Sequence, residues 1–123
     1  MAAALRIELF VEDIDAFADF YRRVLAFTLV DDRRSDDSPY AAVARDGVRI
    51  AAVPAWRTID RAARDIPTGV EIVIEVDDVH ADHARVLDTG WPLADSLRQR
   101  PWGLTDFRVY DPDGHFIRIT GRG

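Results

Sequence analysis

The stretch that decides the fold lies near the C-terminus, where residues 100–120 read RPWGLTDFRVYDPDGHFIRIT. Apolar and polar residues alternate along 107–110 and again along 116–120, which is the period of a half-buried β-strand. Between them, Asp-Pro-Asp-Gly at 111–114 is strong turn chemistry, because proline presets φ and glycine supplies a left-handed conformation. This stretch therefore predicts a loop followed by a β-hairpin. We expect the rest of the chain to supply the elements with which this hairpin pairs.

Length and composition limit the classes of protein. The 123 residues suit one domain with its own core. A net charge of −6 argues against a nucleic-acid partner, whose backbone demands a positive surface. The absence of cysteine excludes disulfides, thiolate metal sites and cysteine nucleophiles. No signal peptide and no apolar run of membrane-spanning length are recognisable, so we expect a soluble cytoplasmic protein without a membrane partner.

In the first half of the chain the apolar period changes from that of a strand to that of a helix and back. We expect a strand over 6–11, a helix from the N-cap Asp13 to near Ala26, a short strand over 27–30, a polar loop over 31–39, and strands over 40–44 and 48–53 joined by an Asp-Gly turn.

The second half repeats this order after a linker over 54–68 that has no clear period. We expect a strand over 70–76, a helix capped by Asp77-Asp78 and ended by Gly90, a strand that opens at 91–93, a loop through Arg100, and the hairpin.

The two halves align as an internal repeat. Residues 7–14 match 72–79, and the turns at Asp46-Gly47 and Asp113-Gly114 match with Ile50 against Ile117. Each half is a strand, a helix and about three strands. The sequence therefore predicts an α+β fold of two βαβββ modules in one domain over 1–123, with module one over 5–54, a linker over 55–68 and module two over 69–121.

The alternation also predicts which side chains face away from the helices and line a cleft. Both charged and aromatic residues have this phase, which suits an open, wet, ligand-sized cleft better than a core, because unpaired buried charge is costly. The residues concerned are Arg6, Glu8, Phe10, Arg49, Ala51, Val53, Glu71, Val73, Glu75, Arg108, Tyr110, Phe116, Arg118 and Thr120.

These motifs resemble the vicinal oxygen chelate superfamily, which contains glyoxalase I, extradiol dioxygenases, and bleomycin- and fosfomycin-resistance proteins. The resemblance covers nearly the whole chain. It rests on Val11-x-Asp13, on FYxxVLxF over 20–27, on the repeat of that unit from Glu71, and on Pro-Trp-Gly over 101–103 followed by Asp-Pro-Asp-Gly-His over 111–115. It implies paired βαβββ modules, a U-shaped cleft, and a homodimer.

Enzymes of that superfamily hold a divalent metal with His and Glu at four strand positions. The resemblance places these positions at Arg6, Glu71, Arg118, and either Ala51 or Arg49. A guanidinium group is permanently protonated and offers no lone pair to a cation. We therefore expect no metal site, no cofactor and no catalytic residue, and we expect Arg6, Arg118 or both to form ion pairs with Glu71.

Within the superfamily, a metal-free cleft is typical of the bleomycin-resistance type, whose members sequester the drug. The matching loop places Trp102 where a planar ligand can stack. Cleft acids such as Glu8 and Glu75 would suit a cationic ligand, whereas four inward arginines, at 6, 49, 108 and 118, suit an anionic or carboxylate-bearing ligand better than a polycation. The predicted ligand-binding residues are Trp102, Glu8, Phe10, Tyr40, Arg49, Trp56, Glu71, Arg108, Tyr110 and Arg118.

Two alternatives stay open. One is a lyase- or dioxygenase-type enzyme on the same fold, metal-dependent or metal-free, in which Glu8 could act as a general base. The other is a non-catalytic module for regulation or assembly. We expect helix-surface positions for His80 and His83 and a turn position for His115, rather than metal or catalytic roles.

Overall fold

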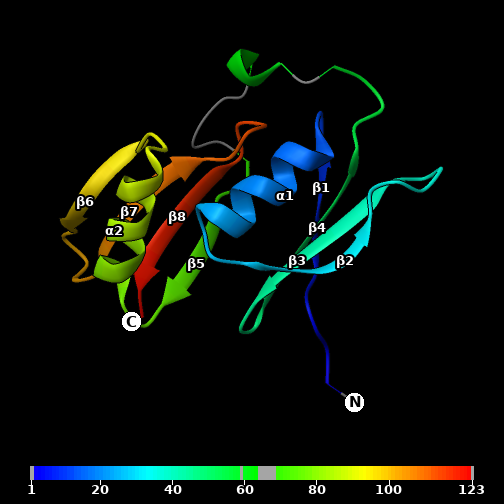
Figure 1. Ribbon diagram of the computed structural model, residues 1–123. Helices are drawn as coiled ribbons and strands as arrows, with labels where there is room; N and C mark the ends of the chain where they lie inside the picture. Colours follow the sequence, from blue (N-terminus) through cyan, green and yellow to red (C-terminus); the bar gives the residue numbers. More distant parts are fainter. Residues whose placement is uncertain (1, 59, 64–68, 123) are drawn as a thin grey trace. The chain divides into compact units, whose positions relative to one another are not determined.

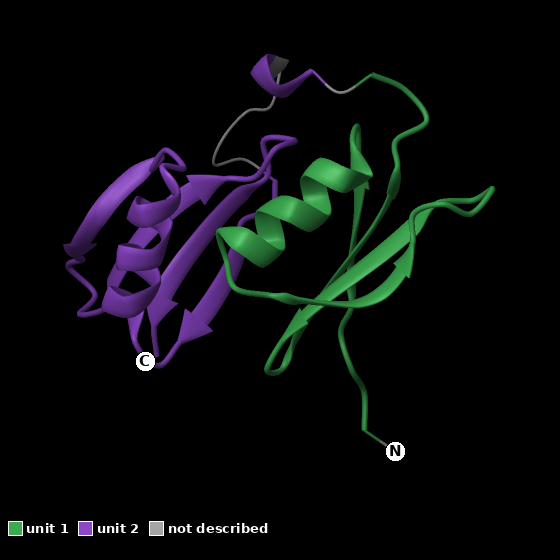
Figure 2. Ribbon diagram, viewed as in Figure 1, with its two compact units in different colours: residues 1–59 green, residues 60–123 purple. Residues whose placement is uncertain are grey.

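The computed structural model describes residues 2–58, 60–63 and 69–122. The chain divides into two compact units, residues 1–59 and 60–123 (Figure 2). Each unit contains one four-stranded sheet. The boundary falls inside the predicted linker, so each unit corresponds to one of the two predicted modules.

The first unit is built as strand, helix and three strands (Figure 1). The sheet order is β1-β4-β3-β2, with β1 parallel to β4 and the other pairs antiparallel. Helix α1 starts at the predicted cap, where a carboxylate oxygen of Asp13 accepts hydrogen bonds from the backbone N–H groups of Asp15 and Ala16 at 2.9 and 3.2 Å. The elements are β1 (Ile7–Val11), α1 (Ile14–Arg23), β2 (Thr28–Arg33), β3 (Tyr40–Arg45) and β4 (Val48–Pro54).

The core of the first unit is an aromatic cluster between α1 and its sheet. The ring of Tyr21 meets Phe20 and Phe27 edge to face, with centroids 5.0 and 5.7 Å apart. Phe17 packs beside Tyr21 at 4.9 Å, and all four residues are buried. The helical stripe of the sequence is therefore the face that α1 turns to the sheet.

The second unit repeats the topology. Its sheet order is β5-β8-β7-β6, with β5 parallel to β8 and the other pairs antiparallel. The cap of α2 is Asp78, and the helix ends at Gly90, whose φ of 78° is left-handed. The elements are a 3₁₀ helix (Arg61–Ala63), β5 (Ile72–Val76), α2 (Val79–Thr89), β6 (Asp95–Gln99), β7 (Thr105–Tyr110) and β8 (Phe116–Gly121).

Helix α2 covers one face of the second sheet (Figure 1). The ring of His83 meets Phe107 edge to face at 5.3 Å, which shows that the helix lies on the face of Phe107 and of its buried neighbours Val109, Ile117 and Ile119. The opposite face, which we call the helix-free face of the second unit, carries the alternate residues of β5, β7 and β8.

The predicted fold class, α+β with two βαβββ modules, is confirmed. Three boundaries were wrong. Helix α1 ends at Arg23 rather than near Ala26, which has a positive φ of 62°. Strand β2 continues to Arg33 into the predicted polar loop, and β6 lies over 95–99, where a loop was expected. Both strands form sheet edges and are largely exposed, so no apolar alternation marked them.

Smaller corrections concern α2 and the linker. His83 faces the sheet rather than lying on the helix surface, whereas Leu87, one turn further along α2, is 53% exposed. Among its described residues, the linker contains a short 3₁₀ helix, Arg61–Ala63. Its residues 59 and 64–68 lie outside the described part of the chain.

Substitution at Gly90 should show how much its left-handed conformation contributes. A Cβ there would meet nothing within 4 Å, so Gly90→Ala adds only backbone strain, about 1 kcal/mol of lost unfolding free energy. Gly47→Ala is the matched control, because its Cβ is equally free and its φ is not in the left-handed region. Urea denaturation compares them, and equal loss in both variants would contradict the assignment.

Candidate functional site

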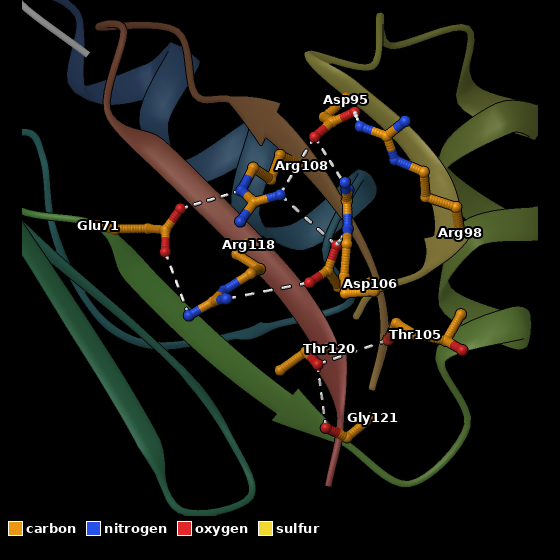
Figure 3. Close-up of polar contacts among 10 residues, drawn as sticks. Glu71, Asp95, Arg98, Thr105, Asp106, Arg108, Arg118, Thr120 and Gly121 are labelled. Atoms are coloured by element: carbon orange, nitrogen blue, oxygen red, sulfur yellow. Dashed lines mark hydrogen bonds and ion pairs between the residues drawn. The ribbon is translucent and has the colours of Figure 1, made fainter. Parts of the chain in front are cut away.

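The helix-free face of the second unit carries a network of carboxylates and guanidinium groups (Figure 3). Arg108 on β7 and Arg118 on β8 are direct cross-strand partners. Like charges directly opposite each other destabilise a sheet. The two arginines are therefore compatible with this register only if carboxylates neutralise them.

Glu71, which precedes β5, lies between the two guanidinium groups. One carboxylate oxygen accepts a hydrogen bond from Nε of Arg108 at 3.0 Å, and the other is 3.3 Å from Nη2 of Arg118 (Figure 3). The side chain of Glu71 is 21% exposed, so this bridge is partly shielded from water. Of the two partners predicted for Glu71, Arg118 is confirmed. Arg6 instead pairs with Glu8 at 3.1 Å in the first unit.

Asp106, fully buried on β7, is the second bridge. Its Oδ1 accepts a 2.6 Å hydrogen bond from Nε of Arg100 and lies 3.6 Å from Nη1 of Arg108. Its Oδ2 is 4.0 Å from Nη1 of Arg118. A third carboxylate, Asp95 on β6, bonds to Arg100 at 2.9 Å and to Arg108 at 3.2 Å. Three carboxylates thus serve three arginines, a set that we call the charge network: Glu71, Asp95, Asp106, Arg100, Arg108 and Arg118.

Burial and pairing act in opposite directions on the ionisation of this network. Burial opposes the charged form of Asp95, but the hydrogen bond from Arg100 and the nearby positive charges outweigh it, so the pKa of Asp95 lies below its usual value. Burial also opposes the charged form of Arg100, and the hydrogen bonds to Asp106 and Asp95 outweigh it, which raises the pKa of that guanidinium. Both groups therefore remain charged at neutral pH.

Two buried atoms of the charge network have no hydrogen-bond partner among the described residues, Oδ2 of Asp106 and Nε of Arg118. Buried polar atoms usually have partners, and an ordered water molecule is a common one. These atoms mark the place where the network is incompletely satisfied.

A pocket of about 410 Å³ lies beside the charge network on the same unit. Its walls come from β5, β8 and the loop before β7. Trp102 is 57% exposed and Val73 is 41% exposed, so the pocket presents both an indole and an aliphatic surface to solvent. The lining residues are Val73, Glu75, Trp102, Leu104, Arg118 and Thr120.

The other predicted binding residues are not among those that line this pocket. In the first unit, Glu8 and Phe10 pair with Ala51 and Val53, and Phe10 is 57% exposed. Arg49 is exposed and has no partner among the described residues. The rings of Tyr40 and Trp56 each meet a guanidinium group, of Arg33 at 4.7 Å and of Arg57 at 4.0 Å. Tyr110 of the second unit packs on Phe116 at 5.3 Å.

The strand registers decide between Ala51 and Arg49 as the second of the family's metal-ligand positions. Ile7 pairs with Ile50, as Ile72 pairs with Ile117 in the repeat. Ala51 is therefore the counterpart of Arg118. The four positions hold Arg6, Ala51, Glu71 and Arg118, and these residues do not fit a divalent metal, because only Glu71 has a lone pair for it. No group of three or more His, Cys, Asp or Glu suited to a metal occurs among the described residues.

Sequence reasoning missed half of the charge network: Asp95, Arg100 and Asp106. Asp95 was assigned to a loop, and Arg100 to the end of it. Asp106 precedes Phe107 by one residue, so its phase already placed it on the helix-free face. Its alternation with Arg108 was the available signal.

The comparisons with known proteins agree with this geometry. The family model "Glyoxalase/Bleomycin resistance protein/Dioxygenase superfamily" matches residues 4–119. The chain belongs to this superfamily. No curated protein sequence matches it significantly.

Two solved structures are similar in fold. TioX from Micromonospora sp. ML1 is 22% identical, with 98% of each chain covered and a TM-score of 0.79. TnmS3, an antibiotic binding protein from Streptomyces sp. CB03234, is 24% identical, with 100% of this chain and 98% of that chain covered and a TM-score of 0.74. At these identities the likeness shows a shared fold. Among the described residues, no helix is long and apolar enough to cross a membrane.

Asp106→Asn tests the charge network as a structural unit. The change leaves Arg100, 8% exposed, facing an uncharged amide, and should lower the unfolding free energy by about 3 kcal/mol. Asp19→Asn, which breaks an exposed pair with Arg23 on α1, should lower it by less than about 0.5 kcal/mol. Denaturant titration of both variants measures the difference. Equal stability of the two would mean that the network contributes nothing to folding.

Proposed function

We propose that this chain is a metal-independent small-molecule binding protein of the drug-sequestering, bleomycin-resistance type, with Trp102 as its aromatic anchor. The observation that carries the proposal is the pocket whose lining combines an exposed indole with aliphatic side chains. Exposed indoles in concave sites supply large contact area and stacking energy to planar ligands. The antibiotic-binding description of the similar TnmS3 is in keeping with this role.

The chemistry of the family's metal positions supports binding without a metal. Arg118 stands at one of them, and its guanidinium is tied to Glu71 at 3.3 Å. The single remaining metal-capable residue is thus already occupied by cations of the protein itself. The alternative of a metal-dependent enzyme would require a ligand set that these positions do not supply.

Incubation with Fe, Mn, Ni, Zn or Mg followed by gel filtration should leave no stoichiometric metal on the protein, because Glu71 is bridged by two arginines. Elemental analysis of the protein peak measures this. Uptake of one metal per chain that disappears in Glu71→Ala and persists in Asp88→Asn, an exposed acid of α2, would overturn the metal-free proposal.

Tryptophan fluorescence should be quenched saturably by metal-free bleomycin, at about one drug per chain, if the pocket binds this drug. Trp102→Ala should weaken binding by about tenfold or more, because aromatic anchors dominate such sites. Since the quenching signal is lost with the indole, calorimetry provides the affinity of the variant.

The matched control is Trp91→Phe. Trp91 lies in the same unit outside the pocket, where its indole N–H donates to the carbonyl oxygen of Tyr110 at 2.8 Å. This variant should bind as the wild type does. Absence of quenching at high drug concentration would reject bleomycin as the ligand, and unchanged affinity of Trp102→Ala would reject the anchor.

A homodimer, which rests on the family resemblance alone, and a cytoplasmic location, which rests on the sequence alone, stay predictions. The further predicted contacts at Glu8, Phe10, Tyr40, Arg49, Trp56 and Tyr110 also stay predictions.

A further inference from the structure

The charge that the pocket beside Trp102 offers to a ligand depends on which of its charged side chains are already paired within the protein. Four inward arginines had favoured an anionic ligand. Arg108 and Arg118 are bound to carboxylates of the charge network, and Arg6 is bound to Glu8. Of the four, only Arg49 has no partner among the described residues, and it belongs to the first unit.

Arg118 is the only cation among the pocket's lining residues, and it is already paired with carboxylates of the protein. Its Nη2 is 3.3 Å from Glu71, its Nη1 is 4.0 Å from Asp106, and its Nε is buried. The charge of Arg118 is therefore already balanced by carboxylates of the protein, and an incoming anion would compete with Glu71 and Asp106 for it or displace one of them. Such displacement costs desolvation of both groups.

Glu75, in contrast to Arg118, has no charged partner among the described residues. It lies on β5 with its side chain exposed and lining the pocket, and it has no ion pair or hydrogen bond within the described part of the chain. Val73 and Trp102 line the same pocket. A ligand ring stacked on Trp102 would therefore lie in the same small pocket as a carboxylate that has no partner of its own.

The remaining polar side chains of the pocket are one hydroxyl, of Thr120, and one indole, of Trp102. The hydroxyl of Thr120 directs its proton to backbone carbonyls, 3.1 Å from that of Gly121 and 3.5 Å from that of Thr105 (Figure 3). It can then offer only lone pairs to a ligand. The indole N–H of Trp102 is the exception, as a donor.

On the basis of the proposed function, we infer that this pocket selects aromatic ligands that carry a protonated amine, and that Glu75 is the residue that determines this selectivity. The ring stacks on Trp102, and the ammonium group pairs with the Glu75 carboxylate. Glu75 has no structural partner to lose, so its substitution should change ligand choice without changing the fold.

Calorimetric titration with three acridines tests the inference at mildly alkaline pH and fixed ionic strength. The probes share one ring system and differ in charge: 9-aminoacridine is a cation, acridine is neutral, and acridine-9-carboxylate is an anion. The wild type should bind the cation about fivefold more tightly than the neutral probe and the anion most weakly. High salt should reduce the cation's advantage, because exposed pairs are screened.

Two variants and a control locate the effect. Glu75→Gln should bind the cation and the neutral probe equally, and Glu75→Lys should favour the carboxylate. Asp88→Asn changes net charge by the same amount as Glu75→Gln, from the helix on the other face of the sheet, and should retain the wild-type preference.

The possible failures are distinguishable. If the anion binds at least as tightly as the cation, or Glu75→Gln retains the cation's advantage, the inference is overturned while Trp102-dependent binding stands. If no acridine binds but bleomycin does, the inference is again overturned alone. If neither bleomycin nor any acridine binds, the proposed function falls with it.

Discussion

The direct opposition of Arg108 and Arg118 on neighbouring strands is the constraint on which the second unit depends. Two guanidinium groups in register repel each other unless negative charge lies between them. The negative charge comes from Glu71, which precedes β5, from Asp106 on β7, and from Asp95 on the edge strand β6. Every strand of the sheet except β8 therefore carries or borders one of the three carboxylates. The two arginines are thus neutralised only when the four strands are paired, so strand pairing and charge neutralisation depend on each other.

This requirement explains why Glu71 is not free for a metal. In the family's arrangement a Glu at this position would share a cation with residues from other strands. Here the cation is a side chain, Arg118, at the position that would otherwise supply a further ligand. The positive charge that faces the Glu71 carboxylate is therefore a side chain of the protein rather than a bound ion. A metal would have to compete with two guanidinium groups at 3.0 and 3.3 Å.

The sequence predicted which residues share a face of each sheet, because the alternation of side chains along a strand is a local property. Phe107 and Val109 belong to one face and Asp106 and Arg108 to the other whatever the partners are. It could not predict β6, since an exposed edge strand has one neighbour and no need of an apolar face. Because β6 was not predicted, the sequence could not place Asp95 in the charge network.

Which arginines remain available to a ligand depends on contacts between residues far apart in the chain. Glu71 and Arg108 are separated by 37 positions, and no local pattern reports their distance. Counting inward charges from the sequence therefore overestimated the positive charge of the site. The alternation placed these charges on the helix-free face, but which of them are paired emerges only from the three-dimensional structure.

The charge network also bears on how the pocket binds. Arg118 forms part of the pocket wall, and its ion pair with Glu71 restricts a side chain that would otherwise lose conformational freedom when a ligand binds. A wall fixed in advance lowers the entropic cost of association, so a network that contributes no net charge can still favour binding.

The cost of that arrangement is two buried atoms, Oδ2 of Asp106 and Nε of Arg118, that have no hydrogen-bond partner among the described residues. In the proposed binding role, affinity would come from the indole and the aliphatic wall, and selectivity from Glu75, the lining carboxylate that the network leaves out.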